Sequence, residues 1–138
     1  MPQQTADRLI FLSYQSSRES IQIASNRISH SKIDYFFSQP QHASPDSSVT
    51  HKLLINQEVH DKRLRSLLNK LLSTGFWDLD DHYGAPETER HYATSIDIRT
   101  SRITHRVIFR SNPSYSAVPQ AFRQAEQVIR QFAADQQK

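Results

Sequence analysis

The sequence predicts an α+β domain: an antiparallel sheet of about five or six strands with two amphipathic helices packed on one face. Three observations lead to this prediction. A hairpin between Tyr92 and Arg110 has one apolar face, and two other segments repeat apolar residues at every third or fourth position. A sheet that is apolar on one side needs a cover on that side only, and two amphipathic helices would supply it.

The hairpin prediction depends on strict alternation of apolar and polar residues in both strands. With Thr100 and Ser101 as the turn, one set of side chains points to the core. The predicted core-facing pairs are Ile98 with Ile103, Ile96 with His105, Thr94 with Val107 and Tyr92 with Phe109. The other face would be exposed to solvent, with Ile108 as its one apolar residue. It carries Ser95, Asp97, Arg99, Arg102, Thr104, Arg106, Ile108 and Arg110.

The residues before the hairpin predict further strands. Leu9–Tyr14 is apolar on both faces, and Ile21 and Ile23 alternate with polar or small residues. Ser25-Asn26 suits a turn before a third segment that contains Ile28. The first forty residues therefore predict a meander of two or three strands, and residues 49–55 resume a strand.

The first helix is predicted to begin between Glu58 and Asp61, with Asp61 or Asn56 as its N-cap. Its apolar face consists of Leu64, Leu67, Leu68, Leu71 and Leu72. Gly75 suits the left-handed position that ends a helix, with Phe76 folding back on the last turn. Trp77 and Leu79 then return apolar surface to the core, before a polar loop at residues 80–90.

The second helix is predicted from about Val118 to Ala134, and Pro119 suits its first turn. Its apolar stripe consists of Val118, Phe122, Ala125, Val128, Ile129 and Phe132. The whole chain, residues 1–138, is predicted to be a single domain with polar tails at 1–7 and 135–138. Residues 38–48 are rich in serine and proline, and we expect a mobile loop there.

Composition excludes several classes of function. The absence of cysteine excludes disulfides, thiol chemistry and cysteine zinc sites. With only two glycines, a phosphate-cradling loop is not available, so we expect no nucleotide or other cofactor. No apolar run is long enough for a signal peptide or a membrane span, so we expect a cytoplasmic protein without membrane insertion. The net charge of +3 permits loose contact with nucleic acid but does not predict it.

The candidate catalytic and metal-binding residues form no recognised constellation. Asp78, Asp80, Asp81 and His82 are the densest group, but their spacing matches no known metal loop, and we interpret them as a wet helix exit. His105 turns toward the covered side of the hairpin. It could act as a base or pH switch, or be a partly buried ring held by one hydrogen bond, which is the commoner case. The sequence lacks a GxSxG or HExxH motif, so we expect no catalytic residue, no metal and no enzyme.

The arginines of the open hairpin face are the candidate partner contact: Arg99, Arg102, Arg106 and Arg110. They could bind phosphates or an acidic protein, or they could keep the sheet soluble. Since no aromatic residue of the hairpin lies between them, protein contact is favoured over nucleic acid.

The segments LLNKLLSTGFWDL, YATSIDIRT, ITHRVIFR and VPQAFRQAEQVI, in this order, resemble a family of small bacterial domains that includes the emfourins, proteinaceous inhibitors of thermolysin-type metallopeptidases. The likeness covers about Leu53 to Phe132. It implies a non-catalytic α+β module that binds another protein, as a peptidase inhibitor-like protein or an accessory subunit. The family's glycine-rich stretch near the first strand corresponds here to Tyr14–Ser20, which has no glycine. The resemblance makes Ser16, Ser17 and Arg18 a candidate loop contact. The alternative function is a weak binder of nucleic acid or another polyanion through the arginine face.

Overall fold

The computed structural model describes residues 8–35, 49–115 and 118–136. The predicted tail at 1–7 and the predicted mobile loop at 38–48 lie outside these residues. The elements are β1 (Leu9–Gln15), β2 (Glu19–Ala24), β3 (Arg27–Tyr35), β4 (Val49–Glu58), α1 (Asp61–Leu72), the short 3₁₀ helix η3 (Phe76–Asp78), β5 (His82–Gly84), β6 (Tyr92–Thr100), β7 (Thr104–Ser111) and α2 (Gln120–Gln136).

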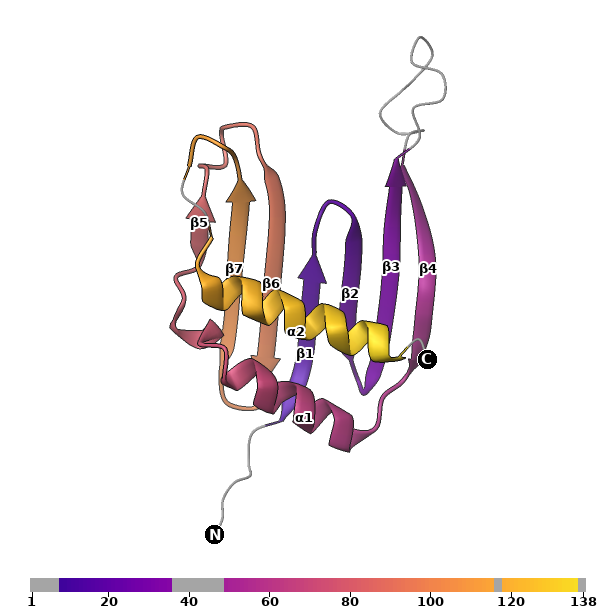
Figure 1. Cartoon of the computed structure of the whole chain (residues 1–138). Coiled ribbons are helices and arrows are strands. Elements are labelled where there is room, and N and C mark those ends of the chain that lie inside the picture. Colours follow the sequence, from indigo (N-terminus) through magenta and orange to yellow (C-terminus); the bar gives the residue numbers. More distant parts are fainter. Residues whose placement is uncertain (1–7, 36–48, 116–117, 137–138) are drawn as a thin grey trace.

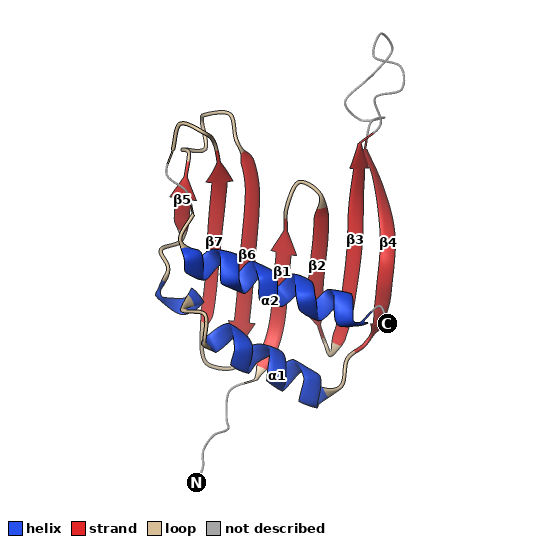
Figure 2. Cartoon of the chain, viewed as in Figure 1, coloured by secondary structure: helices blue, strands red, loops and turns tan. Residues whose placement is uncertain are grey.

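A seven-stranded sheet with the order β4-β3-β2-β1-β6-β7-β5 carries both helices on one face (Figure 1). The α+β class is therefore confirmed, with seven strands where about five or six were expected. The additional strand is β5, which lies in the predicted polar loop and pairs with β7 in parallel. Figure 2 shows the two helices crossing the strands on the same side. The sheet thus has one covered face and one open face.

The predicted hairpin forms, with Ile96, Ile98, Val107 and Phe109 facing the core as predicted, but its register is different. Ile98 pairs with His105 and Ile96 with Val107, a shift of two residues from the expected pairs. A shift of two keeps the side chains within both strands on their faces, because side chains alternate with a period of two. Tyr92, at the end of β6, and Ile103, in the turn before β7, are nevertheless 72% and 43% exposed, so the prediction that they face the core is wrong. The turn follows Thr100, whose hydroxyl accepts hydrogen bonds from the backbone N–H groups of Arg102 (3.2 Å) and Ile103 (3.0 Å). This longer turn replaces the one predicted at Thr100-Ser101.

The start of α1 falls within the predicted range, but its cap is a different residue. His60 is the N-cap, and its ring accepts a hydrogen bond from the backbone N–H of Lys62, so neither Asp61 nor Asn56 caps the helix. Gly75 adopts the predicted left-handed conformation, with φ of 85°, directly before η3. Phe76 is then buried in the same core as the helix leucines.

Helix α2 runs two residues past the predicted end, and its last residue is not a solvated tail. Gln136 is buried, its side-chain oxygen accepts a hydrogen bond from Arg63 (3.2 Å), and its backbone oxygen accepts one from Gln57 (3.2 Å). The expectation that residues from Asp135 onward face water is therefore wrong for Gln136. The polar residue is buried because α1 and β4 offer it partners.

The core lies between the covered face of the sheet and the two helices. The strands contribute buried residues such as Leu12, Ile21 and Ile96. The helices contribute Leu67 and Phe122, among others. Within the described residues, no helix has the length and apolar composition that a membrane span requires.

Candidate functional site: the open sheet face and the β1–β2 turn

The open face of the sheet consists of rows of register partners that run from β7 to β4. Partners that lie directly opposite each other share a face, so each row can be followed across the sheet. The middle row is Arg106, Asp97, Ser13, Gln22, Ser29 and Asn56. A neighbouring row is Thr104, Arg99, Phe11, Ala24, Arg27 and Glu58. The open face is therefore mostly polar, with its arginines concentrated toward β6 and β7.

Three of the four predicted contact arginines share this face. Arg99 and Arg106 are exposed, and Arg110 is half-buried. Arg102 lies instead in the turn before β7, since the register differs from the predicted one. Asp97 lies directly opposite Arg106, and its carboxylate also pairs with Arg99 at 3.4 Å. One carboxylate thus faces two of the arginines.

An aromatic ring lies beside these arginines, contrary to the expectation from the hairpin alone. Phe11 of β1 is the register partner of Arg99, whose guanidinium stacks over the ring at 5.1 Å from the ring centre. Arg27 of β3 adds a further exposed cation to the same row. Sequence reasoning missed both residues because nothing in the sequence indicates that β1 inserts between β2 and β6. The apolar outer face of the first strand was the one signal available for Phe11.

The predicted loop contact, Ser16, Ser17 and Arg18, forms the turn between β1 and β2. The backbone N–H of Ser16 donates to Glu19 (2.9 Å) and the backbone oxygen of Arg18 accepts from Ile33 (2.8 Å), so the turn is tied to β3. The pairing of β6 with β1 ends at Ser95, whereas β6 continues to Tyr92. At about 3.3 Å per residue, β6 extends roughly 10 Å beyond the end of β1.

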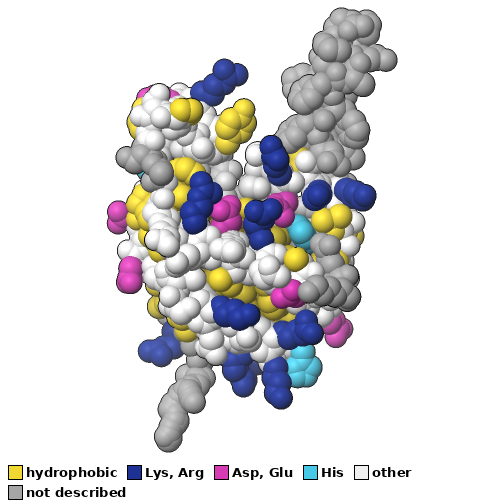
Figure 3. All heavy atoms as spheres, in the orientation of Figure 1, with side chains coloured by type: hydrophobic (Ala, Val, Ile, Leu, Met, Phe, Trp, Pro, Cys, Tyr) yellow, Lys and Arg dark blue, Asp and Glu magenta, His cyan; other side chains and the backbone are white. Residues whose placement is uncertain are grey.

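The turn is consequently recessed between taller strands rather than exposed at a tip. Figure 1 shows the β1–β2 turn lying lower than the ends of β6 and β7 on one side and of β3 on the other. We call this recess the notch; in the space-filling view the outline of the molecule steps down beside the part formed by β6 and β7 (Figure 3). A partner that contacts Ser16–Arg18 has to enter this notch.

A polar cluster lies on the covered side, between the sheet and α2. The Tyr14 hydroxyl donates to a carboxylate oxygen of Glu126 at 2.7 Å, and Arg123 donates to the other oxygen at 3.1 Å. Glu19 is held by His30 and by Arg130, each at 2.9 Å. Burial, together with the adjacent Glu126 carboxylate, raises the pKa of Tyr14 above its usual value. Each carboxylate already has a cationic or hydroxyl partner, so the cluster ties α2 to the strands.

The remaining candidate residues do not converge on one site. Asp78 is the last residue of η3. The His82 ring forms a hydrogen bond with the backbone oxygen of Ala85, three residues further along the chain, at 3.0 Å. Over the part of the chain that the structure describes, no group of three or more histidine and acidic side chains is placed to hold a metal ion. His105 is partly buried, with its ring bonded to the backbone oxygen of Leu79 at 2.8 Å. This is the commoner of the two states expected for His105.

Comparison of the chain with known protein families, with curated proteins and with solved structures gave no match.

Proposed function

We propose that the chain is a non-catalytic protein-binding module that contacts an acidic partner through its open sheet face. The observation that supports this most directly is an uncovered face of a seven-stranded sheet on which arginines outnumber carboxylates in the register rows described above. Arg27, Arg99, Arg106 and Arg110 lie there, and in the described chain the carboxylates of the same rows are Asp97 and Glu58. A flat face with excess positive charge attracts a complementary acidic surface.

The module could serve as an accessory subunit of a larger assembly or as a peptidase inhibitor-like protein, as the resemblance to the emfourins implies. An inhibiting loop has to reach into a peptidase cleft, whereas the Ser16–Arg18 turn lies below the ends of the neighbouring strands. This geometry favours the accessory subunit. A direct assay separates the two, since an inhibitor-like protein would slow hydrolysis of a peptide substrate by thermolysin at stoichiometric concentration.

The proposal is tested by affinity capture from a lysate of the native host at low salt, with wild-type protein and two double variants compared side by side. Arg99→Glu with Arg106→Glu reverses two exposed charges on the open face, and we expect it to lose the captured partner. Lys62→Glu with Arg65→Glu makes the same change in net charge on α1 and should retain it. Capture that is absent from the wild type, or equal for both double variants, would contradict the proposal.

The second candidate function is weak binding of nucleic acid or another polyanion on the same face. The stacking of Arg99 over Phe11 favours it, because single-stranded nucleic acid binds to platforms that combine rings and cations. A titration with a fluorescent oligonucleotide over a range of salt concentrations tests it, and binding should weaken steeply as salt rises. Absence of binding at low salt, or binding unchanged by Phe11→Ala with Arg106→Ala, would exclude this function.

A further inference from the structure

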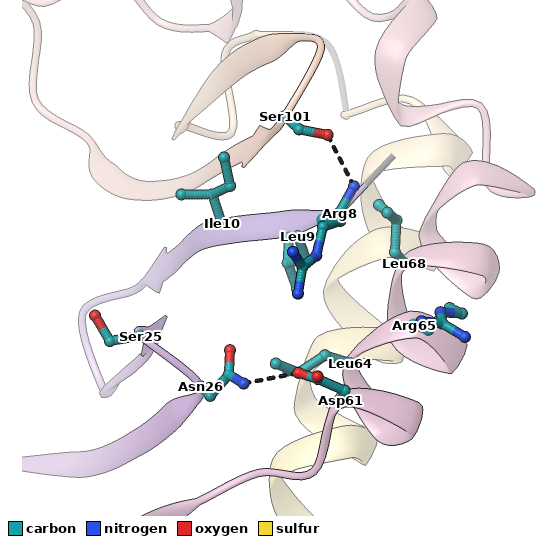
Figure 4. A pocket seen from close by; sticks show the side chains of 10 residues that line it. All are labelled: Arg8, Leu9, Ile10, Ser25, Asn26, Asp61, Leu64, Arg65, Leu68 and Ser101. Atoms are coloured by element: carbon teal, nitrogen blue, oxygen red, sulfur yellow. Dashed lines mark hydrogen bonds between the residues drawn. The ribbon is translucent and has the colours of Figure 1, made fainter. Parts of the chain in front are cut away.

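A cleft opens at the end of the molecule opposite the notch, between the start of β1, the β2–β3 turn and α1 (Figure 4). Pairing of β1 with β2 begins only at Phe11, because the turn at Ser25-Asn26 has φ values of 51° and 59° and reverses the chain there. Leu9 and Ile10 therefore extend beyond the last β2 partner. The resulting cavity has a volume of about 420 Å³, within the range of small-molecule sites.

The inner lining of the cleft is aliphatic. Leu64 and Leu68 of α1 and Leu9 of β1 line it, and Ile10 lies at its mouth (Figure 4). Ile10 is 55% exposed, which is high for a large apolar residue in a strand. Leu64 and Leu68 are only 5% and 3% exposed, so the apolar surface open to a ligand belongs mainly to Ile10 and the half-buried Leu9. Covering that surface with an apolar chain would release ordered water, so the cleft suits an aliphatic group.

The rim of the cleft is cationic. Arg8 and Arg65 are both exposed and line it. Asp61 is the acidic residue of the lining, and its carboxylate accepts a hydrogen bond from Asn26 at 2.7 Å. Figure 3 shows further lysine and arginine side chains gathered at this end of the molecule, over α1. The rim therefore has more positive than negative charge and suits an anionic group.

We propose that this cleft binds a fatty acid, with the aliphatic chain against Leu9 and Ile10 and the carboxylate between Arg8 and Arg65. The two observations are independent, since one concerns the lining and the other the charge of the rim. This site lies on a different part of the molecule from the open sheet face and does not depend on the function proposed above.

The test is a titration of the full chain with decanoate below its micellar concentration, followed by two-dimensional amide NMR. We expect saturable shifts confined to Leu9, Ile10, the Ser25-Asn26 turn and the first turns of α1. Arg8→Ala with Arg65→Ala should weaken binding by about three- to tenfold, as expected for the loss of two exposed ion pairs. Lys70→Ala, also on α1 but away from the cleft, is the matched control and should bind normally.

Three further binding measurements test the proposal. Ile10→Asp puts a carboxylate at the mouth and should abolish binding, while a thermal melt equal to that of the wild type shows that the fold is kept. Decanol tests the role of the arginines, because an alcohol that binds as tightly as decanoate would overturn it. Tighter binding of N-acetyl-leucine than of decanoate would overturn the fatty acid in favour of a protein carboxyl terminus. Shifts spread over the whole sheet would overturn the site.

Discussion

Replacing Tyr14 with phenylalanine removes a single hydroxyl from the interface between the sheet and α2 and leaves the ring in place. The side chain is 1% exposed, and the hydroxyl donates to the Glu126 carboxylate at 2.7 Å. A hydrogen bond to a charged group contributes about 1.5–3 kcal/mol. Since Glu126 keeps Arg123 as a second partner, we expect Tyr14→Phe to lower the free energy of unfolding by about 1.5–2 kcal/mol at neutral pH.

The pH dependence of this difference gives a sharper test. The pKa of Tyr14 is raised in the folded state from an ordinary value of 10.0, because burial and the adjacent carboxylate disfavour the phenolate. For an acid whose folded pKa is raised, the stabilisation is present below the unfolded pKa and is lost as pH rises toward the folded pKa. The difference between wild type and Tyr14→Phe should therefore shrink above about pH 10, by up to about 1.4 kcal/mol per pH unit.

Urea unfolding followed by circular dichroism at several values between about pH 8 and pH 11 measures both effects. Tyr92→Phe is the matched control, since the Tyr92 side chain is 72% exposed and its replacement should leave stability nearly unchanged. The reasoning is refuted if the two tyrosine variants have equal stability at neutral pH, or if the difference for Tyr14→Phe stays constant as the pH rises.

Three further substitutions test how the turns and the edge strand are built. Gly84→Ala should lower the free energy of unfolding by several kcal/mol, because Gly84 has a φ of 90° and an added Cβ would lie 2.1 Å from the backbone oxygen of Arg110. A decrease in melting temperature of only a few degrees or less would contradict this. Thr100→Val removes the hydroxyl that accepts two backbone N–H groups of the β6–β7 turn and should cost about 1–2 kcal/mol in urea unfolding, whereas Thr104→Val on the exposed face should cost little. Asn26→Ala should cost about 1–2 kcal/mol and Asn26→Gly less, since the residue has a φ of 59°; equal costs would show that the bond to Asp61, rather than the backbone, dominates.

The faces of the hairpin could be predicted from sequence except at Tyr92 and Ile103, which are exposed, but its register could not. Alternation assigns Ile96, Ile98 and Val107 to the core, and a register shift by any even number of residues leaves that assignment unchanged. The register depends on the turn, where the Thr100 hydroxyl favours a longer loop than the two residues first expected. Strand β5 was missed because three residues cannot show a period, and its pairing depends on the close approach of Gly84 to β7.

The candidate site depended on contacts between residues that are distant in the chain, and these are where sequence reasoning failed. Tyr14 and Glu126 are 112 residues apart. Phe11 meets Arg99 only because β1 takes the central place between β2 and β6. Periodicity reports which side of a strand faces the core, whereas the order of strands follows from long-range pairing that it does not encode. The arginines could thus be proposed from sequence, but the ring beside them could not.

The composition of the open face also limits the kind of contact that it can make. Register rows place serine, glutamine and asparagine at its centre, and its large apolar residues among those with described side chains are Phe11, Ile33, Leu53 and Ile108. Permanent subunit interfaces are markedly more apolar than this, resembling a domain core cut in half. A polar face with clustered arginines instead favours an association that is steered by charge and exchanges readily. If the open face binds as proposed, raising the salt concentration from about 0.05 M to 0.5 M should slow association far more than it speeds dissociation, because screening acts on the approach of the partners. An association rate independent of salt would mean that the arginines keep the sheet soluble and do not recruit a partner.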